Sequence, residues 1–524
     1  MLSIPEQFNV ATYFVDRNVH EGRGERIAIE CGEQRVTYRE LLENTNRLGN
    51  ALRTLGVRRE ERVSLLLLDC PEFLYCFFGA IKIGAIAVPT NTLLKPAEHE
   101  YILNDSRAKV MFVSEALLPQ VEQIPKNKLR YLQHMVVVGE SGGSQRLREL
   151  MADASPHLAP ESTSKDDVAF WLYSSGSTGP PKGCVHLHHD MVVCSELYAR
   201  NILRMTESDR CYSVARLFFA YGLGNAAYFP LAFGATSILS PERPTPAGIY
   251  ANIERYRPTL FFSVPTNYAA LLAYRRGTGN DFDLSSIGHA ISAGEALPAG
   301  LFHRFKERFG IEILDALGST ENLHMVTSNL PGEVRPGSSG KVIPGYEVRI
   351  VDEQDQPVPV GEIGNLLIKG DSLCAGYWEQ PDKTKAAFQG EWFRTGDRYW
   401  QDEKGYLWFA GRSGDLFKVS GSYVSPMEVE SALAAHPAVQ ESAVVGREDG
   451  DGLLRPAAYV VLNSEYAADD ALVRQLQEWV GERLGNFKRP RWVEFVEELP
   501  KTSTGKLQRY KLREREMPGS KSQR

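Results

Sequence analysis

The feature that most constrains the fold is a series of short, almost wholly apolar segments separated by longer amphipathic ones. The apolar run at 63–68 is followed by a helical stretch at 72–84 and by a second apolar run at 85–89. Two further runs, at 109–113 and 135–138, continue the alternation. A strand that is apolar on both faces is typical of a parallel sheet covered by helices on both sides. The first 400 or so residues therefore predict an α/β architecture built from parallel sheets.

The pattern changes after residue 340, where shorter strands are separated by turn residues. The segments at 346–351 and 364–368 are typical of a small antiparallel barrel. The last roughly 110 residues form a compact unit of mixed strands and helices, including a strongly amphipathic helix at 470–484. We therefore expect a large N-terminal domain at 1–413 and a small α+β C-terminal domain at 414–524.

Charge and cysteine content exclude several classes of protein. Lys plus Arg number 59 and Asp plus Glu 66, so the net charge of −7 lacks the basic surplus that nucleic-acid binding requires. The seven cysteines are scattered and form no CxxC pair, which excludes a disulfide framework and a zinc knuckle. The first residues lack the basic start and apolar stretch of a signal peptide, and the apolar stretch at 73–89 is short for a membrane span and carries Lys82. We expect a soluble cytoplasmic protein with no nucleic-acid or membrane partner.

The most informative motif follows the strand-like segment 169–172. It combines hydroxyls, glycines and a lysine in the order Tyr173-Ser174-Ser175-Gly176-Ser177-Thr178-Gly179-Pro180-Pro181-Lys182-Gly183. Glycines let backbone N–H groups approach an anion, hydroxyls add donors and the lysine adds charge. The spacing is not that of the Walker motif. A flexible linker is the alternative, but linkers rarely join a buried strand to a Pro-Lys-Gly turn, so the motif predicts a phosphate cradle.

Four weaker motifs follow in order along the chain. The segment 315–321, Asp-Ala-Leu-Gly-Ser-Thr-Glu, sets a hydroxyl beside a carboxylate, which suits magnesium shared with nucleotide phosphates but is also a common helix N-cap. Asp397 could accept both hydroxyls of a ribose, and an Asx-turn explains it equally well in isolation. A glycine-rich segment at 411–421 lies at the expected domain boundary, and Lys506 lies on a turn near the C-terminus.

Taken together and in this order, the five motifs resemble the adenylate-forming superfamily of acyl-CoA synthetases, adenylation domains and luciferases. The resemblance covers nearly the whole chain, from about residue 37 to residue 509. It is closest to the benzoate-CoA ligase branch, including 2-aminobenzoate (anthranilate)-CoA ligases, and rests on the segments 170–176, 217–225, 292–298, 318–324 and 418–426. The resemblance implies an AMP-forming acid–thiol ligase that uses ATP, Mg²⁺ and coenzyme A. An aromatic carboxylate would attack the α-phosphate of ATP to give aroyl-AMP and pyrophosphate, and CoA would then displace AMP.

The resemblance also implies roles for individual residues. Lys506 would stabilise the charge that develops at the bridging oxygen and the attacking carboxylate, while Thr320 and Glu321 would hold the α-phosphate and Glu321 the magnesium. The phosphate cradle would consist of Ser174, Ser175, Gly176, Ser177, Thr178, Gly179 and Lys182. The adenine would lie against Gly294, Glu295, Ala296, Asp315, Ala316 and Leu317, and the ribose against Asp397 and Arg412.

The same resemblance places the aromatic acid between two segments of the N-terminal domain. The implied lining residues are Phe219, Ala220, Tyr221, Gly222, Leu323, His324 and Met325. This aromatic, apolar surface suits one small ring, and it lacks the Asp with which amino-acid-activating relatives hold an ammonium group. Benzoate or a substituted benzoate such as 2-aminobenzoate fits best. His324 could bond a ring substituent or could simply form part of the wall.

In this family the C-terminal domain swings between the two half-reactions. It would bring Lys506 in for adenylation and the loop with Lys418, Ser420 and Gly421 in for the CoA step. The hinge position, usually Asp, is Gly414, which absorbs large backbone changes but fixes no pose. One alternative function is a stand-alone adenylation enzyme that loads a carrier protein, and another is a non-catalytic nucleotide sensor, which would have no need of Lys506. A monomer and a homodimer are equally compatible with the sequence.

Overall fold

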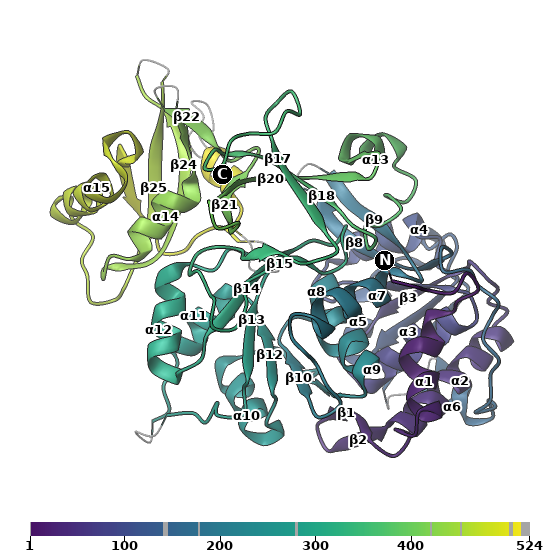
Figure 1. Ribbon diagram of the computed structural model, residues 1–524. Helices are drawn as coiled ribbons and strands as arrows, with labels where there is room; N and C mark the ends of the chain where they lie inside the picture. Colours follow the sequence, from purple (N-terminus) through teal and green to yellow (C-terminus); the bar gives the residue numbers. More distant parts are fainter. Residues whose placement is uncertain are drawn as a thin grey trace.

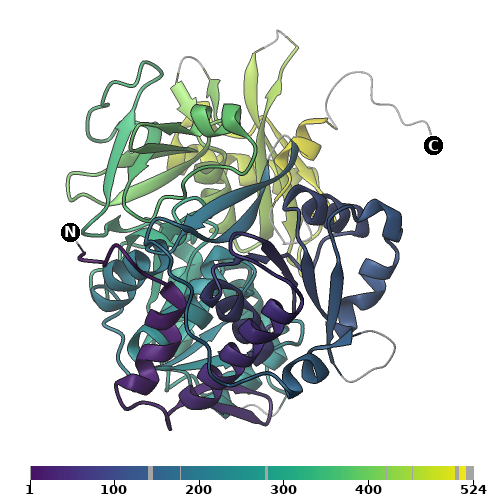
Figure 2. The same cartoon turned by 90° about the vertical axis from the view of Figure 1, so that its right-hand side faces the viewer.

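The computed structural model describes residues 2–139, 145–176, 179–277, 281–419, 422–450, 453–501 and 507–514. Residues 140–144, in a polar and glycine-rich stretch, and the C-terminal residues 515–524 lie outside these ranges. Two large sheets form the N-terminal part of the molecule, and the C-terminal elements form a body at one end of it (Figures 1 and 2). None of the helices in the described ranges has the length and apolar character needed to cross a lipid bilayer.

The first large sheet has seven strands and is parallel except at β8–β9. In spatial order its strands are β7 (Gln145–Arg146), β6 (His134–Val138), β5 (Val110–Ser114), β3 (Arg62–Leu66), β4 (Ile86–Pro89), β8 (Val168–Gly176) and β9 (Gly179–Leu187). Helix α3 (Pro71–Lys82) packs against α2 (Tyr38–Thr54). Because α3 is buried along almost its whole length, its sequence is apolar on every face. The parallel sheet predicted from the apolar runs is confirmed.

The second large sheet has nine strands. Their spatial order is β16 (Lys341–Val342), β15 (Met325–Ser328), β14 (Ile313–Gly318), β13 (His289–Ser292), β12 (Leu260–Ser263), β10 (Arg210–Ser213), β11 (Thr236–Leu239), β1 (Ile27–Cys31) and β2 (Gln34–Thr37). The pairs from β14 to β1 are parallel, and the edge pairs are antiparallel. Parallel neighbours end at the same edge of a sheet, so the segments that follow β13 and β14 lie side by side.

A curled antiparallel sheet accounts for the small barrel predicted after residue 340. It contains β17 (Glu347–Val351), β18 (Gly364–Lys369), β20 (Trp392–Gln401), β19 (Phe388–Gln389) and β21 (Leu407–Arg412). The segment that precedes β19 includes α13 (Pro381–Ala387) and pairs with β9 through the Cys184–Tyr377 bridge. This bridge brings the curled sheet against the seven-stranded sheet at the predicted phosphate cradle.

The C-terminal elements surround a small core of their own. They are β22 (Phe417–Val419), β23 (Ser422–Val424), α14 (Pro426–Ala434), β24 (Val439–Glu448), β25 (Leu454–Leu462), α15 (Asp470–Leu484), β26 (Trp492–Phe495) and α16 (Arg509–Glu514). Strands β25 and β26 are parallel and α15 connects them, as a βαβ unit requires. Helix α15 has the predicted bounds because Asp469 caps its first turn through Leu472 N–H at 2.7 Å.

Candidate active site

The predicted phosphate cradle is the tip of a β-hairpin. Ser174 pairs with Lys182, and Gly176 pairs with Gly179, across the antiparallel β8–β9 ladder. The two strands therefore continue into the glycine-rich motif. Ser177 and Thr178 lie outside the described residues, and Ser175, Gly176 and Gly179 are described in their backbone only. The register therefore sets the backbone of Ser174 opposite that of the lysine.

Helix α4 (Pro96–Asp105) holds both arms of this hairpin. The hydroxyl of Tyr173, on β8, donates to Asp105 Oδ2 at 2.5 Å. The hydroxyl of Tyr101 donates to the carbonyl of Pro181, on β9, at 3.2 Å. Burial of Tyr173, followed by the charge of Asp105, raises the pKa of its hydroxyl far above the usual value, so it remains a donor. Residues outside the motif thus fix the base of the hairpin.

Lys182, Glu321 and Tyr377 meet beside the hairpin. The Lys182 ammonium lies 3.8 Å from Glu321 Oε1 and 4.0 Å from the centre of the Tyr377 ring. The Tyr377 hydroxyl donates to Glu321 Oε1 at 2.9 Å, and burial together with this carboxylate raises the pKa of Tyr377 well above its usual value. The structure therefore joins two predicted residues, Lys182 and Glu321, through a third that no sequence motif indicated.

The donor set at this place fits a magnesium ion bound mainly through phosphate. Glu321 supplies a carboxylate and Thr320 a hydroxyl, both oxygen donors of the kind that Mg²⁺ prefers. Within the described ranges, no group of three or more His, Cys, Asp or Glu side chains could hold a metal. Magnesium at such a site usually takes one or two carboxylates and completes its shell with substrate phosphates and water.

The turn that carries Thr320 and Glu321 follows β14 and is tightly constrained. A Cβ on Gly318 would lie 2.4 Å from the carbonyl oxygen of His324, so only glycine fits there. Leu323, fully buried, adopts a left-handed conformation with φ of 65°. The backbone N–H of Cys374 donates to the carbonyl of Glu321 at 2.7 Å. The turn is thus held by its own geometry and by the segment before α13.

The two segments assigned to adenine lie together, as the parallel sheet predicts. The carboxylate of Asp315, on β14, accepts a hydrogen bond from Leu297 N–H at 3.3 Å, which links β14 to the segment after β13. In that segment Gly294 has a φ of 86°, and Glu295 accepts from the Thr266 hydroxyl at 3.2 Å. Asp315 is only 3% exposed, and its burial raises the pKa of the carboxyl to about 8.

The raised pKa of Asp315 predicts a pH-dependent cost to stability. Ionisation in the folded state is disfavoured up to about pH 8, whereas the unfolded chain ionises near pH 4, so the stability associated with this group falls as the pH rises between these values. Asp315→Asn keeps an acceptor for Leu297 N–H but cannot ionise. We expect the variant to gain a few kcal/mol relative to the unmodified protein between pH 5 and pH 8. Denaturant unfolding without ATP measures the free energy of unfolding of both proteins at pH 5 and at pH 8. The same difference between the two proteins at both pH values would contradict the prediction.

The two residues assigned to ribose also meet. Asp397 on β20 is opposite Arg412 on β21 in the antiparallel register, and the Arg412 Nε lies 2.8 Å from Asp397 Oδ1. The Asp397 side chain is 12% exposed and the Arg412 side chain 63%, so the arginine forms the solvent side of the pair. The arrangement presents a carboxylate fixed by a charged partner, which suits it to accept hydroxyl hydrogens.

The aromatic-acid residues come from α8 (Ala220–Leu223) and from the turn after β14. The His324 ring centre lies 5.8 Å from that of Tyr221, and His324 Nε2 bonds to Asn225 Oδ1 at 3.1 Å. Burial lowers the pKa of His324 to about 3, so the ring is neutral. A Cβ on Gly224 would lie 2.3 Å from the His324 ring, which requires glycine at that position. Asn225 is a contact of His324 that sequence analysis did not assign.

Several predicted residues belong to the C-terminal part. Lys506, Ser420 and Gly421 lie outside the described residues, and Lys418 is described in its backbone, within β22. The proposed hinge, Gly414, lies between β21 and β22, and its carbonyl accepts from Arg513 at 3.0 Å. A Cβ at Gly414 would contact no atom within 4 Å, so the local structure does not require glycine there.

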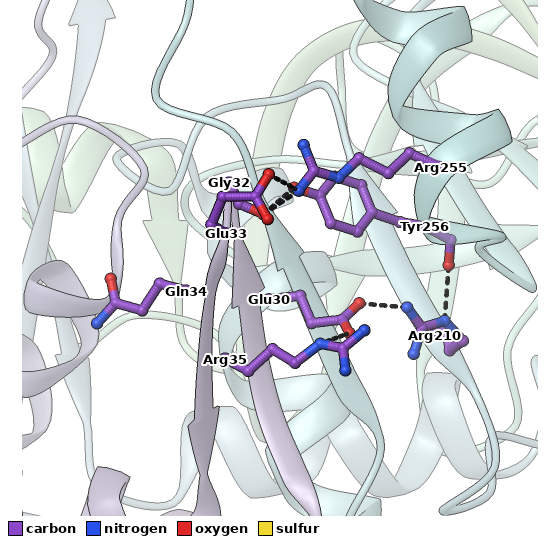
Figure 3. Close-up of a pocket in the computed structure, with 8 residues that line it drawn as sticks. All are labelled: Glu30, Gly32, Glu33, Gln34, Arg35, Arg210, Arg255 and Tyr256. Carbon is purple, nitrogen blue, oxygen red and sulfur yellow. Dashed lines mark hydrogen bonds and ion pairs between the residues drawn. The ribbon is translucent and has the colours of Figure 1, made fainter.

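A cavity of about 330 Å³ lies at the β1–β2 hairpin, and it includes none of the predicted site residues (Figure 3). Its charges are paired with one another. Buried Glu30 lies between Arg210 and Arg35, and Arg255 lies 2.6 Å from Glu33. Each of these arginines contacts a carboxylate, although Arg35 and Arg210 share Glu30. The ion pairs fasten the hairpin to α10 (Pro246–Tyr256) and β10.

Known proteins match this chain over nearly its whole length. The family model of AMP-binding enzymes matches residues 15–378, and that of the AMP-binding enzyme C-terminal domain matches residues 428–506. A benzoate–CoA ligase of Thauera aromatica is 48% identical over 514 residues, covering 98% of this chain and 97% of the relative. A 4-hydroxybenzoate–CoA/benzoate–CoA ligase of Rhodopseudomonas palustris is 44% identical over 98% of this chain and 95% of the relative.

Solved structures agree with these matches. The crystal structure of an anthranilate CoA ligase in complex with anthranoyl-AMP has a TM-score of 0.93 and 43% identity, with 98% of each chain covered. A benzoate CoA ligase from Burkholderia xenovorans LB400 has a TM-score of 0.88 and 44% identity, covering 97% of this chain and 100% of that chain. The predicted fold class and the resemblance to benzoate-CoA ligases are both confirmed. The chain belongs to the AMP-binding enzyme family.

Proposed function

We propose that the protein is an ATP-dependent aryl-CoA ligase, which converts a small aromatic carboxylic acid to its CoA thioester through an aroyl-AMP intermediate. The observation that carries the proposal is the convergence of Lys182 and Glu321 beside an apolar wall formed by α8 and His324. The full-length likeness to benzoate–CoA and anthranilate CoA ligases supports it. A carboxylate and a triphosphate are both anions, so their reaction needs oriented positive charge more than a strong base.

In the first half-reaction the hairpin residues and Lys182 bind the β- and γ-phosphates. Thr320 and Glu321 hold the α-phosphate and Mg²⁺, which supplies charge neutralisation when bound. The Tyr377 hydroxyl keeps Glu321 oriented, because it donates to one carboxylate oxygen and leaves the second free of that bond. Asp397 and Arg412 hold the ribose, and the segments at 294–297 and 315–317 enclose the adenine. Lys506 stabilises the developing charge at the attacked phosphorus.

In the second half-reaction the thiol of CoA attacks the aroyl carbonyl and AMP leaves. Lys418, Ser420 and Gly421 belong to this step, for which the C-terminal domain rotates about Gly414. Transfer to a carrier protein is the alternative, and the full-length relatives named as CoA ligases favour CoA. The seven cysteines are all free thiols, which supports a reducing, cytoplasmic location.

The acid itself is benzoate or a benzoate with one small substituent. His324 is neutral, and its Nδ1 has no hydrogen-bond partner among the described residues. With Nε2–H donated to Asn225 Oδ1, Nδ1 is an acceptor, which suits a ring substituent that carries a hydrogen, such as the amino group of 2-aminobenzoate. A buried neutral imidazole carries no negative charge to compensate an ammonium group, so aromatic amino acids are poor candidates.

The test is the release of AMP from ATP, with and without CoA, across benzoate and its 2-amino, 2-hydroxy, 3-hydroxy and 4-hydroxy forms. We expect CoA-dependent AMP release with benzoate or 2-aminobenzoate and none with phenylalanine. Adenylation without turnover by CoA would point to a carrier protein as the acceptor. No adenylation of any of these acids would overturn the proposed function.

A further inference from the structure

A buried histidine beside the nucleotide site faces hydrogen-bond acceptors on both ring nitrogens. His186 Nδ1 lies 2.7 Å from Asp190 Oδ2, and Nε2 lies 2.8 Å from the carbonyl oxygen of Thr320. Both side chains are fully buried, and the His186 ring stacks on Phe170 with centres 5.1 Å apart. Asp190 Oδ2 also accepts from Leu187 N–H at 3.1 Å. The imidazole is therefore fixed in its plane and at both ends.

The partners determine how the ring is held. A carbonyl oxygen can only accept, so Nε2 donates to Thr320. At the other end of the ring, a hydrogen bond of 2.7 Å joins Nδ1 to the Asp190 carboxyl. That carboxyl is itself held by Leu187 N–H at Oδ2 and lies 3.2 Å from His189 Nε2 at Oδ1. Asp190 therefore orients His186 from a fixed position.

The position of His186 along β9 connects this pair to the phosphate-binding groups. Lys182, four residues earlier on the same strand, contacts Glu321, and His186 contacts the preceding residue, Thr320. One strand of the seven-stranded sheet thus contacts two successive residues of the turn after β14, which belongs to the nine-stranded sheet. The separation in sequence between His186 and Thr320 is 134 residues, so only the tertiary fold creates this contact.

We propose that His186, oriented by Asp190, is a positioning residue for the adenylation half-reaction. It fixes the Thr320 carbonyl against β9 and thereby sets the place of the Thr320 hydroxyl and the Glu321 carboxylate relative to Lys182. It contacts neither ATP nor the acid and acts through Thr320. The proposal rests on the proposed function, because it assigns His186 to the step in which ATP and the acid form aroyl-AMP.

Two substitutions separate the two hydrogen bonds of the ring. In His186→Gln the terminal amide occupies roughly the place of Nε2 and can still donate to the Thr320 carbonyl. In His186→Asn the shorter amide occupies the place of Nδ1, remains a partner for Asp190 and cannot reach Thr320. We expect His186→Asn to lower the kcat of benzoate-dependent pyrophosphate–ATP exchange about tenfold, and His186→Gln to keep most of the rate.

A third substitution, Asp190→Asn, tests the orienting partner without a change of shape. If the atom at the Oδ2 position is oxygen, the ring loses its carboxyl partner and the amide nitrogen faces His189 Nε2. If it is nitrogen, it meets the Leu187 N–H donor. In either arrangement one hydrogen bond of this side chain is lost or weakened, so we expect a severalfold lower rate of pyrophosphate–ATP exchange. His188→Asn, at a buried histidine whose Nδ1 accepts from Val10 N–H at 3.0 Å, is the matched control.

Transfer of the benzoyl group from synthetic benzoyl-AMP to CoA, together with thermal unfolding, distinguishes positioning from a general structural role. We expect the KM for benzoate to stay within about twofold in His186→Asn. The transfer rate should fall clearly less than the exchange rate, since benzoyl-AMP retains the α-phosphate that Thr320 holds but has no β- or γ-phosphate and needs no magnesium. Equal loss in both half-reactions, or a Gln variant no better than the Asn variant, would overturn the positioning role. No exchange by the unmodified protein would instead overturn the proposed function, and this inference with it.

Discussion

Glu321→Gln is expected to lower the rate of adenylation by about a thousandfold. The amide keeps the shape of the side chain and can still accept from the Tyr377 hydroxyl, which lies 2.9 Å away. It removes the negative charge that binds magnesium and that pairs with Lys182 at 3.8 Å. Pyrophosphate–ATP exchange, measured over a range of Mg²⁺ concentrations, gives the size of the loss and any shift in magnesium dependence.

Two comparisons show whether the loss in Glu321→Gln belongs to magnesium and phosphate binding. Glu333→Gln removes an exposed carboxylate outside the site and should leave the exchange rate unchanged. Tyr377→Phe removes only the hydroxyl that orients Glu321, so its effect should be smaller, about tenfold. If Glu321→Gln retained more than a tenth of the rate at every magnesium concentration, the role assigned to this carboxylate would be wrong.

The parts of this site that could be predicted from the sequence are those that lie in short, contiguous motifs. The phosphate motif ends in Lys182, the turn after β14 carries Thr320 and Glu321, and each motif can be identified without knowledge of the rest. The two adenine segments also lie together, as expected for segments that follow the parallel neighbours β13 and β14. The phosphate motif and the turn after β14 belong to different sheets, so strand order does not predict that they meet. The bounds of α15 and of the central strands followed from hydrophobic periodicity in the same way.

The residues that sequence reasoning missed are those that depend on contacts between distant segments. Tyr377 orients Glu321 only because the segment before α13 pairs with β9 at Cys184. His186 lies on β9, the strand that also carries Lys182, but its bond to Thr320 requires two sheets to meet. No local pattern of residue types records such a contact, since a tyrosine or histidine in a strand is also an ordinary core residue.

Lys506→Ala is expected to reduce adenylation by about a thousandfold and to leave transfer from synthetic aroyl-AMP to CoA nearly intact. An ammonium group placed at the bridging oxygen and the attacking carboxylate matters only while the triphosphate is being cleaved, because the mixed anhydride is already formed in the second step. Lys506 lies outside the described residues. The residue that follows it, Leu507, forms a backbone bridge with Lys501. Arg509 lies close enough to Glu295 for their charges to interact. The segment that follows Lys506 is therefore near the adenine residues.

Lys511→Ala is the matched control for Lys506→Ala, because Lys511 is an exposed lysine of the same segment, in α16. Its loss removes one positive charge from the C-terminal segment without removing a group assigned to the reaction, so both half-reactions should keep their rates. Equal loss of adenylation and transfer in a folded Lys506→Ala protein would contradict the assigned role, since it would mean that the lysine serves both poses of the C-terminal domain. A selective loss would instead tie Lys506 to the same half-reaction as Glu321, so that two charges from distant segments of the chain act on one triphosphate.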